Sequence, residues 1–105
     1  MAKFIMIATS TAKEGREEEY NAWYDQTHIA DICAVPGFKS GQRWRAVPEA
    51  SPNTPPADYI AIYEIEADDA SQCVDELLRR AGAGEMQISE DIDMESANIW
   101  IYRKY

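Results

Sequence analysis

Residues 16–38 read REEEYNAWYDQTHIADICAVPGF, and this stretch decides the fold. Its aromatic and polar side chains recur at helical spacing, which predicts an amphipathic helix over residues 16–34. Three glutamates near its start suit the positive end of a helix dipole. Pro36 and Gly37 end the helix and return the chain to an extended conformation.

Strand-like sequence lies on both sides of this helix, and a second helix follows later in the chain. The Pro-rich residues 48–56 form a loop, and the acidic residues 85–96 carry no clear pattern. The resulting order, β-α-β-β-α-β in a single domain over residues 1–105, is the ferredoxin-like α+β arrangement, a four-stranded antiparallel sheet with two helices on one face. The expected strands cover residues 3–9, 38–47, 58–66 and 98–105, and the second helix, capped by Asp68 or Asp69, covers about 70–81.

The charge balance limits the possible partners. Ten Lys and Arg against 19 Asp and Glu give a net charge of −9, so we expect no binding to nucleic acid or to an anionic membrane. No apolar run is long enough to cross a bilayer, and we expect a cytoplasmic protein. One histidine and two distant cysteines predict no metal site, and the absence of nucleotide-binding motifs predicts no cofactor.

Both faces of the predicted sheet are apolar. The first strand places Phe4 and Met6 on one face and Ile5 and Ile7 on the other, and the last strand alternates in the same way. Two helices cover only one face, so the other needs a second apolar surface. The sequence therefore predicts a homodimer with its sheets face to face, enclosing a chamber into which His28 projects.

The densest group of polar and aromatic side chains lies in the first helix. His28 is the only histidine and is the candidate general base, with Asp31 as the carboxylate that orients it. Tyr24, one turn earlier, is the candidate proton donor, and Asn21 assists by hydrogen bonding. Structural roles for these residues stay open: His28 as a capping residue, and Trp23 as part of the core rather than a substrate contact.

The second strand supplies two alternative walls for a pocket. If its first set of side chains faces inward, Trp44 stacks on the substrate, and Gln42 orients a carbonyl group. If its second set faces inward, Arg43 binds a carboxylate, unless the arginines lie on the surface. The first set is Phe38, Ser40, Gln42 and Trp44, and the second is Lys39, Arg43 and Arg45.

The pattern N-x-W-Y-x3-H-x2-D over residues 21–31, followed by Pro36-Gly37-Phe38 and an arginine-bearing strand, resembles the dimeric α/β-barrel superfamily, and its EthD-like branch most. The resemblance implies the dimeric α/β-barrel fold and a functional role for His28. The superfamily contains polyketide cyclases, cofactor-independent monooxygenases, muconolactone isomerase and haem-degrading enzymes, so fold alone does not name the reaction.

The residues favour a small cofactor-independent enzyme of lyase, isomerase or cyclase type. It would act by acid–base chemistry on a hydrophobic, aromatic or polyketide-like carbonyl compound. Two alternatives remain: a non-catalytic binding protein or sensor for a hydrophobic metabolite, and a cofactor-free monooxygenase. Haem degradation is disfavoured, because it would need His28 as an iron ligand and a basic contact to the propionates.

Overall fold

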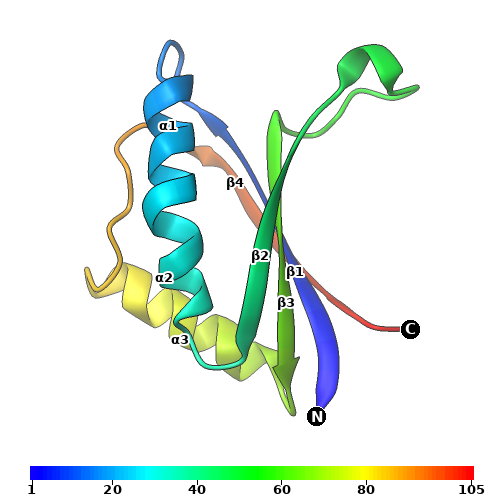
Figure 1. Cartoon of the computed structure of the whole chain (residues 1–105), viewed down its shortest axis with the longest axis vertical. Helices are drawn as coiled ribbons and strands as arrows, with labels where there is room; N and C mark the ends of the chain where they lie inside the picture. Colours follow the sequence, from blue (N-terminus) through cyan, green and yellow to red (C-terminus); the bar gives the residue numbers. More distant parts are fainter.

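The computed structural model describes all 105 residues, as a four-stranded sheet with its helices on one face (Figure 1). The strand order is β2-β3-β1-β4, every neighbouring pair is antiparallel, and the predicted ferredoxin-like α+β fold is confirmed. No helix is both long and apolar enough to span a membrane. The elements are β1 (Ala2–Ala12), α1 (Glu17–Trp23), a π-helical turn (Tyr24–His28), α2 (Ile29–Cys33), β2 (Phe38–Arg45), a 3-10 turn (Pro48–Ala50), β3 (Tyr59–Ala67), α3 (Ala70–Gly82) and β4 (Ile92–Arg103).

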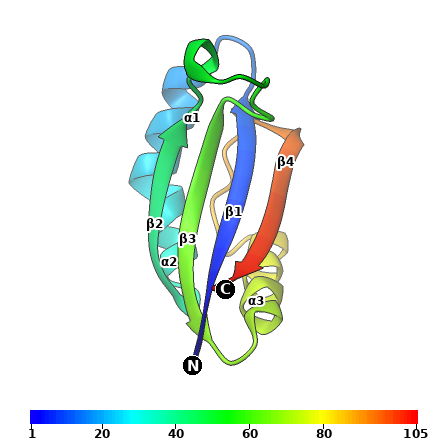
Figure 2. The ribbon, with the colours of Figure 1, turned by 90° about the vertical axis from the view of Figure 1, so that its right-hand side faces the viewer.

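The two faces of the sheet have different surroundings. On the helix-covered face, Met6 pairs across the strands with Tyr63, and both are fully buried. The opposite face, called the open face below, has no helix packed across it, and only the Pro-rich connection with its 3-10 turn lies beside one end of it (Figure 2). Its side chains, placed there by the strand registers, are Ile5, Ile7, Ser40, Gln42, Trp44, Ile60, Ile62, Trp100 and Tyr102.

An irregularity at the start of β2 changes which side chains share a face. Phe38 pairs with Ile65 and Ser40 with the adjacent Glu64, so one extra residue stands between them. Phe38 is therefore buried under the helices, whereas Ser40 lies on the open face. A Cβ at Gly41 would lie 2.6 Å from the ring of Tyr63, so only glycine fits beside this tyrosine.

The last strand begins six residues earlier than predicted, at Ile92 instead of 98. A register shift divides its pairing with β1 into two parts, on either side of Ser10. The Ser96 hydroxyl accepts a hydrogen bond from the backbone N–H of Thr11 at 2.9 Å and donates one to the carbonyl of Asp93 at 2.6 Å. A side chain thus replaces the missing backbone partner, which strand periodicity alone does not indicate.

Candidate functional site

A π-helical turn interrupts the first helix and determines the geometry of the site. The backbone N–H of Ile29 donates to the carbonyl of Tyr24, five residues earlier. Such a turn brings residues five apart onto one side, and the rings of Trp23 and His28 stack with centroids 4.4 Å apart and planes at 24°. In a regular α-helix, which has 3.6 residues per turn, these two side chains would point to different sides of the helix. π turns of this kind are frequent at functional sites.

The imidazole of His28 is partly buried, and its Nδ1 is fully buried without a hydrogen-bond partner. Burial lowers the pKa of His28 to about 4, against the opposing effect of the Asp31 charge. The ring is therefore neutral at pH 7 and can accept a proton or a hydrogen bond.

His28 lines a pocket of about 150 Å³ on the helix-covered side of the sheet. Fourteen of its 18 lining residues are hydrophobic, and none is an acid, a lysine or an arginine. The pocket lies inside one protomer, so the predicted chamber between two sheets is not where His28 projects. The reason is that the first helix packs on the face opposite the open face.

The connection over residues 83–91 closes one side of this pocket. Met86 and Ile88 contribute to its lining, and the indole Nε1 of Trp23 donates to the carbonyl of Gln87 at 2.7 Å. Arg16 pairs with Asp91 at 2.8 Å at the end of the same connection. Trp23 thus connects the His28 ring to the segment that closes the pocket.

Tyr24 also lines the pocket and meets His28 edge-on, with ring centroids 5.0 Å apart at 85°. Burial raises the pKa of Tyr24 to about 12, so its hydroxyl stays protonated at neutral pH and is available as a donor. The hydroxyl of Tyr63 lies near that of Tyr24, but it is buried without a well-formed hydrogen bond.

Asn21 and Arg43 lie together on the far side of Tyr24 and do not line the pocket. Arg43 donates to Asn21 Oδ1 at 2.7 Å and to Asp25 Oδ1 at 2.9 Å. Asn21 Nδ2 donates to the Tyr59 hydroxyl at 3.3 Å. Both terminal nitrogens of Arg43 are thus bound to the first helix, while its Nε–H is buried without a partner. Direct contact of Asn21 and Arg43 with a substrate stays a prediction.

The structure places the other predicted site residues as follows. Gln42 and Trp44 lie on the open face, away from His28, because the irregularity in β2 puts Arg43 on the helix-covered face. Their contact with a substrate stays a prediction. Trp44 is 54% exposed. Asp31, the predicted orienting carboxylate, acts on the pKa of His28 through its charge, and Nδ1 of the ring has no hydrogen-bond partner.

Some pocket residues were missed by sequence analysis. Met86 and Ile88 are isolated apolar residues in an acidic stretch, which was the only available signal for them. Thr9, Ser10 and Asn98 supply the remaining polar atoms of the pocket from β1 and β4. Ser10 is hydrogen-bonded to the buried hydroxyl of Tyr20, a contact that depends on the register shift in β1.

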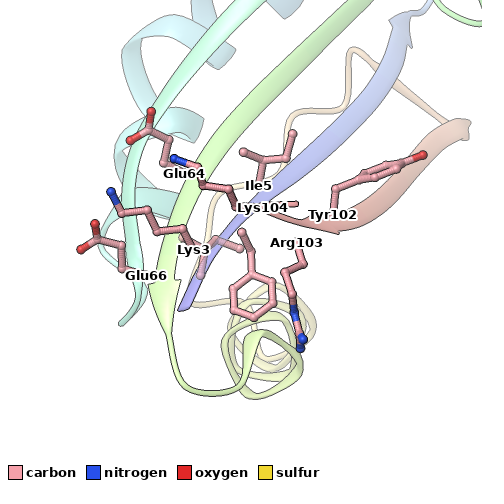
Figure 3. A pocket seen from close by; sticks show the side chains of 9 residues that line it. Lys3, Ile5, Glu64, Glu66, Tyr102, Arg103 and Lys104 are labelled. Atoms are coloured by element: carbon pink, nitrogen blue, oxygen red, sulfur yellow. The ribbon is translucent and has the colours of Figure 1, made fainter. Parts of the chain in front are cut away.

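Two larger depressions lie elsewhere on the molecule. One, of about 340 Å³, lies between Trp44, Trp100 and the Pro-rich connection. The other, of about 330 Å³, lies at the end of the sheet near both termini (Figure 3). There the side chains of Lys3, Glu64 and Arg103 point away from one another rather than toward a common point. Neither depression contains His28, so the smaller pocket is the candidate site.

Comparison with known proteins supports the fold. No protein-family model matches the sequence, and no curated protein matches it. A crystal structure from Shewanella loihica PV-4, provisionally classed as a monooxygenase, is similar with a TM-score of 0.64 and 17% identity, over 99% of this chain and 95% of that one. The haem-degrader MhuD from Mycobacterium tuberculosis, with two haems bound in its active site, is similar with a TM-score of 0.65 and 16% identity, over 96% and 94%.

At these identities the likeness establishes the fold alone. The class of protein is therefore a small domain with the ferredoxin-like α+β fold. Neither similar structure supports the narrower EthD-like assignment.

Proposed function

We propose that this chain is a small cofactor-independent monooxygenase that uses the neutral imidazole of His28 as a general base. The observation that carries the proposal is the neutral, partly buried imidazole of His28 in the wall of a pocket without charged residues. The likeness to a protein provisionally classed as a monooxygenase favours dioxygen as the second reactant. The lyase, isomerase or cyclase reading becomes the second candidate.

The pocket favours an uncharged compound of modest size. An engineered apolar cavity of about 150 Å³ holds benzene, which sets the scale for a pocket of about 150 Å³. Transfer of a charged group into a site without counter-charges is costly. An aromatic compound with a hydroxyl group meets both conditions, because its ring packs against apolar walls and its hydroxyl pairs with His28.

The residues around His28 do not fit a haem. Its propionates would need cationic partners, and the lining contains neither lysine nor arginine. The space suits a single ring rather than a porphyrin. The proposed reaction therefore uses no haem, although the similar structure of MhuD has haem bound in its active site.

The proposed reaction starts with proton transfer from a phenolic hydroxyl to His28. Burial disfavours the resulting imidazolium, and the Asp31 charge offsets part of that cost because it raises the pKa of His28. The electron-rich phenolate then reacts with dioxygen: one oxygen atom becomes a ring carbonyl and the other leaves as water. The water carries the phenolic hydrogen and the displaced ring hydrogen, so the substrate supplies all the electrons and no external reductant is needed.

Proton abstraction beside a carbonyl group is the second candidate, supported by the neutral hydroxyl of Tyr24 next to His28. Tyr24 would donate to the developing enolate while His28 takes the proton. Such a lyase, isomerase or cyclase reaction proceeds without dioxygen. A non-catalytic binding protein would show saturable binding and no product.

We also propose that the protein acts as a homodimer joined through the open face. Trp44, Trp100 and Tyr102 are 54%, 45% and 57% exposed there, next to isoleucines of β1 and β3. An exposed apolar surface of this kind is typical of an interaction site. A second copy of the same sheet, related by a two-fold axis, supplies a matching apolar surface.

Guaiacol, an electron-rich phenol with a free ring position, serves as the first probe. We expect oxygen uptake with one quinone and one water formed per dioxygen, measured with an oxygen electrode and by quinone absorbance. His28→Gln should lower the rate about 10²–10⁴-fold, the usual contribution of a general base. Gln26→Ala, an exposed change in the same π turn, is the matched control.

Equal rates in His28→Gln and the parent would remove His28 from the mechanism. Turnover of a carbonyl probe under nitrogen would favour the second candidate over the monooxygenase. Saturable binding of guaiacol without any product would support the binding protein.

A further inference from the structure

Arg43 connects the sheet to both parts of the first helix. Its side chain is only 13% exposed. It donates to Asn21 in α1 at 2.7 Å and to Asp25 in the π turn at 2.9 Å. One guanidinium on β2 thus holds the α-helical and π-helical segments at a set distance from the strand.

The flat face of the same guanidinium covers the ring of Tyr24. Its central carbon lies 4.3 Å from the centroid of that ring, and 5.2 Å from that of Tyr59. Tyr24 meets His28 edge-on at 5.0 Å, and His28 stacks on Trp23 at 4.4 Å. A continuous row of packed side chains therefore runs from β2 to the pocket.

We propose that Arg43 is a positioning residue for His28, holding the π turn and the Tyr24 ring so that the imidazole faces the pocket. Arg43 itself does not line that pocket. The role demands arginine, since lysine has neither the planar face that covers a ring nor the fork that reaches two acceptors. The inference rests on the proposed function only in that His28 is taken as the general base.

The charges around His28 allow a pKa change caused by movement of the ring to be distinguished from one caused by loss of the Arg43 charge. Asp31 is the one charged residue whose field moves the pKa of His28, and burial is the larger cause. The pocket walls from β1, α3 and β4 contribute no charged side chain. A changed titration of His28 in an Arg43 variant therefore reports a changed position or exposure of the ring.

The test is an NMR titration of the imidazole, which is unambiguous because His28 is the only histidine. Arg43→Lys keeps the charge, Arg43→Met removes it, and Arg45→Met is the matched control. Arg45 lies on the same strand and face, is exposed, and has its guanidinium 5.8 Å from the Tyr59 ring.

We expect both Arg43 variants to raise the His28 midpoint by about one pH unit or more, because a loosened ring becomes solvated. The Ile29 amide, which closes the π turn on Tyr24, should exchange at least about tenfold faster with deuterium. Arg45→Met should leave both readouts unchanged.

An unchanged midpoint and exchange rate in folded Arg43→Lys would overturn the proposal, and so would an equal shift in Arg45→Met. If Arg43→Lys and Arg43→Met fail to fold, Asp25→Ala decides, because it removes only a partner that is 63% exposed. Faster exchange at Ile29 supports the proposal there, and unchanged exchange contradicts it. These measurements use no ligand, so absence of guaiacol turnover would refute the monooxygenase and leave the positioning role to be judged separately.

Discussion

The two faces of this sheet have similar composition but different surroundings. On the helix-covered face, Met6 and Tyr63 are fully buried, and a pocket remains beside His28. On the open face, Trp44 and Trp100 are about half exposed, at 54% and 45%. The same strands supply both sets, because successive side chains point to opposite faces.

The comparison teaches that an apolar surface alone does not locate a functional site. The open face has more exposed aromatic area, yet the unpaired imidazole lies on the other side. The helix-covered face combines apolar walls with a few polar side chains, among them the neutral imidazole, which is the usual composition of a small-molecule site. The open face offers shape and hydrophobicity, which suit a protein partner.

The largest expected difference between the faces is in stability. Ile65 is 1% exposed under the helices, and Ile62 on the same strand lies on the open face. Ile65→Ala should lower the free energy of unfolding by about 2–5 kcal/mol, independent of protein concentration. Ile62→Ala should lower the free energy of unfolding by less at low protein concentration, and by more at high concentration, where the dimer forms. Urea unfolding at two concentrations measures both, and equal costs would show that the faces are equally buried.

Acid should weaken the helix-covered face through His28. Between pH 6.5 and about 4 the unfolded chain binds a proton that the native imidazole does not, so stability falls as pH drops through this window. The full loss is on the order of 3 kcal/mol. Melting curves from pH 7 to 4 should show a steeper decline for the parent than for His28→Gln, in which the carboxylates still titrate. An equal loss of stability in the parent and in His28→Gln would show that the imidazole is exposed to solvent in the native state.

The open face should be sensitive to charge. Trp100→Glu puts a carboxylate on the proposed interface and should weaken the dimer by about 2 kcal/mol or more, roughly thirtyfold in dissociation constant. Light scattering during gel filtration measures the shift toward monomer. Gln26→Glu, with the same charge change on the exposed helix surface, should not alter the assembly. A parent protein that is already monomeric at high concentration would contradict the dimer.

The smallest expected effect concerns Asp31. Its charge raises the pKa of His28 against burial, so Asp31→Asn should lower the His28 midpoint further, by less than about one pH unit. The imidazole NMR titration measures this directly. A rise instead would mean that Asp31 restrains the ring rather than acting by its charge.

Much of the fold could be predicted because it depends on local patterns. The helix over residues 16–34 and the strands followed from periodicity, and Asp69 caps α3 by accepting from Ser71 as its residue type predicts. The site could be predicted only in part. Sequence spacing brought Tyr24 and His28 together, but it left open which set of β2 side chains faces the pocket, because the answer depends on the irregularity between Phe38 and Ser40.

The sequence by itself determined the order of the elements, the face-to-face alternation of apolar side chains and the single histidine, since these depend on neighbouring residues alone. The tertiary structure decided which face the helices cover, where the strand registers shift and how the π turn stacks His28 on Trp23. These outcomes depend on contacts between residues far apart in the chain, such as Arg43 with Asp25 or Trp23 with Gln87. Such contacts form only when the packed elements exclude water, which no local pattern specifies.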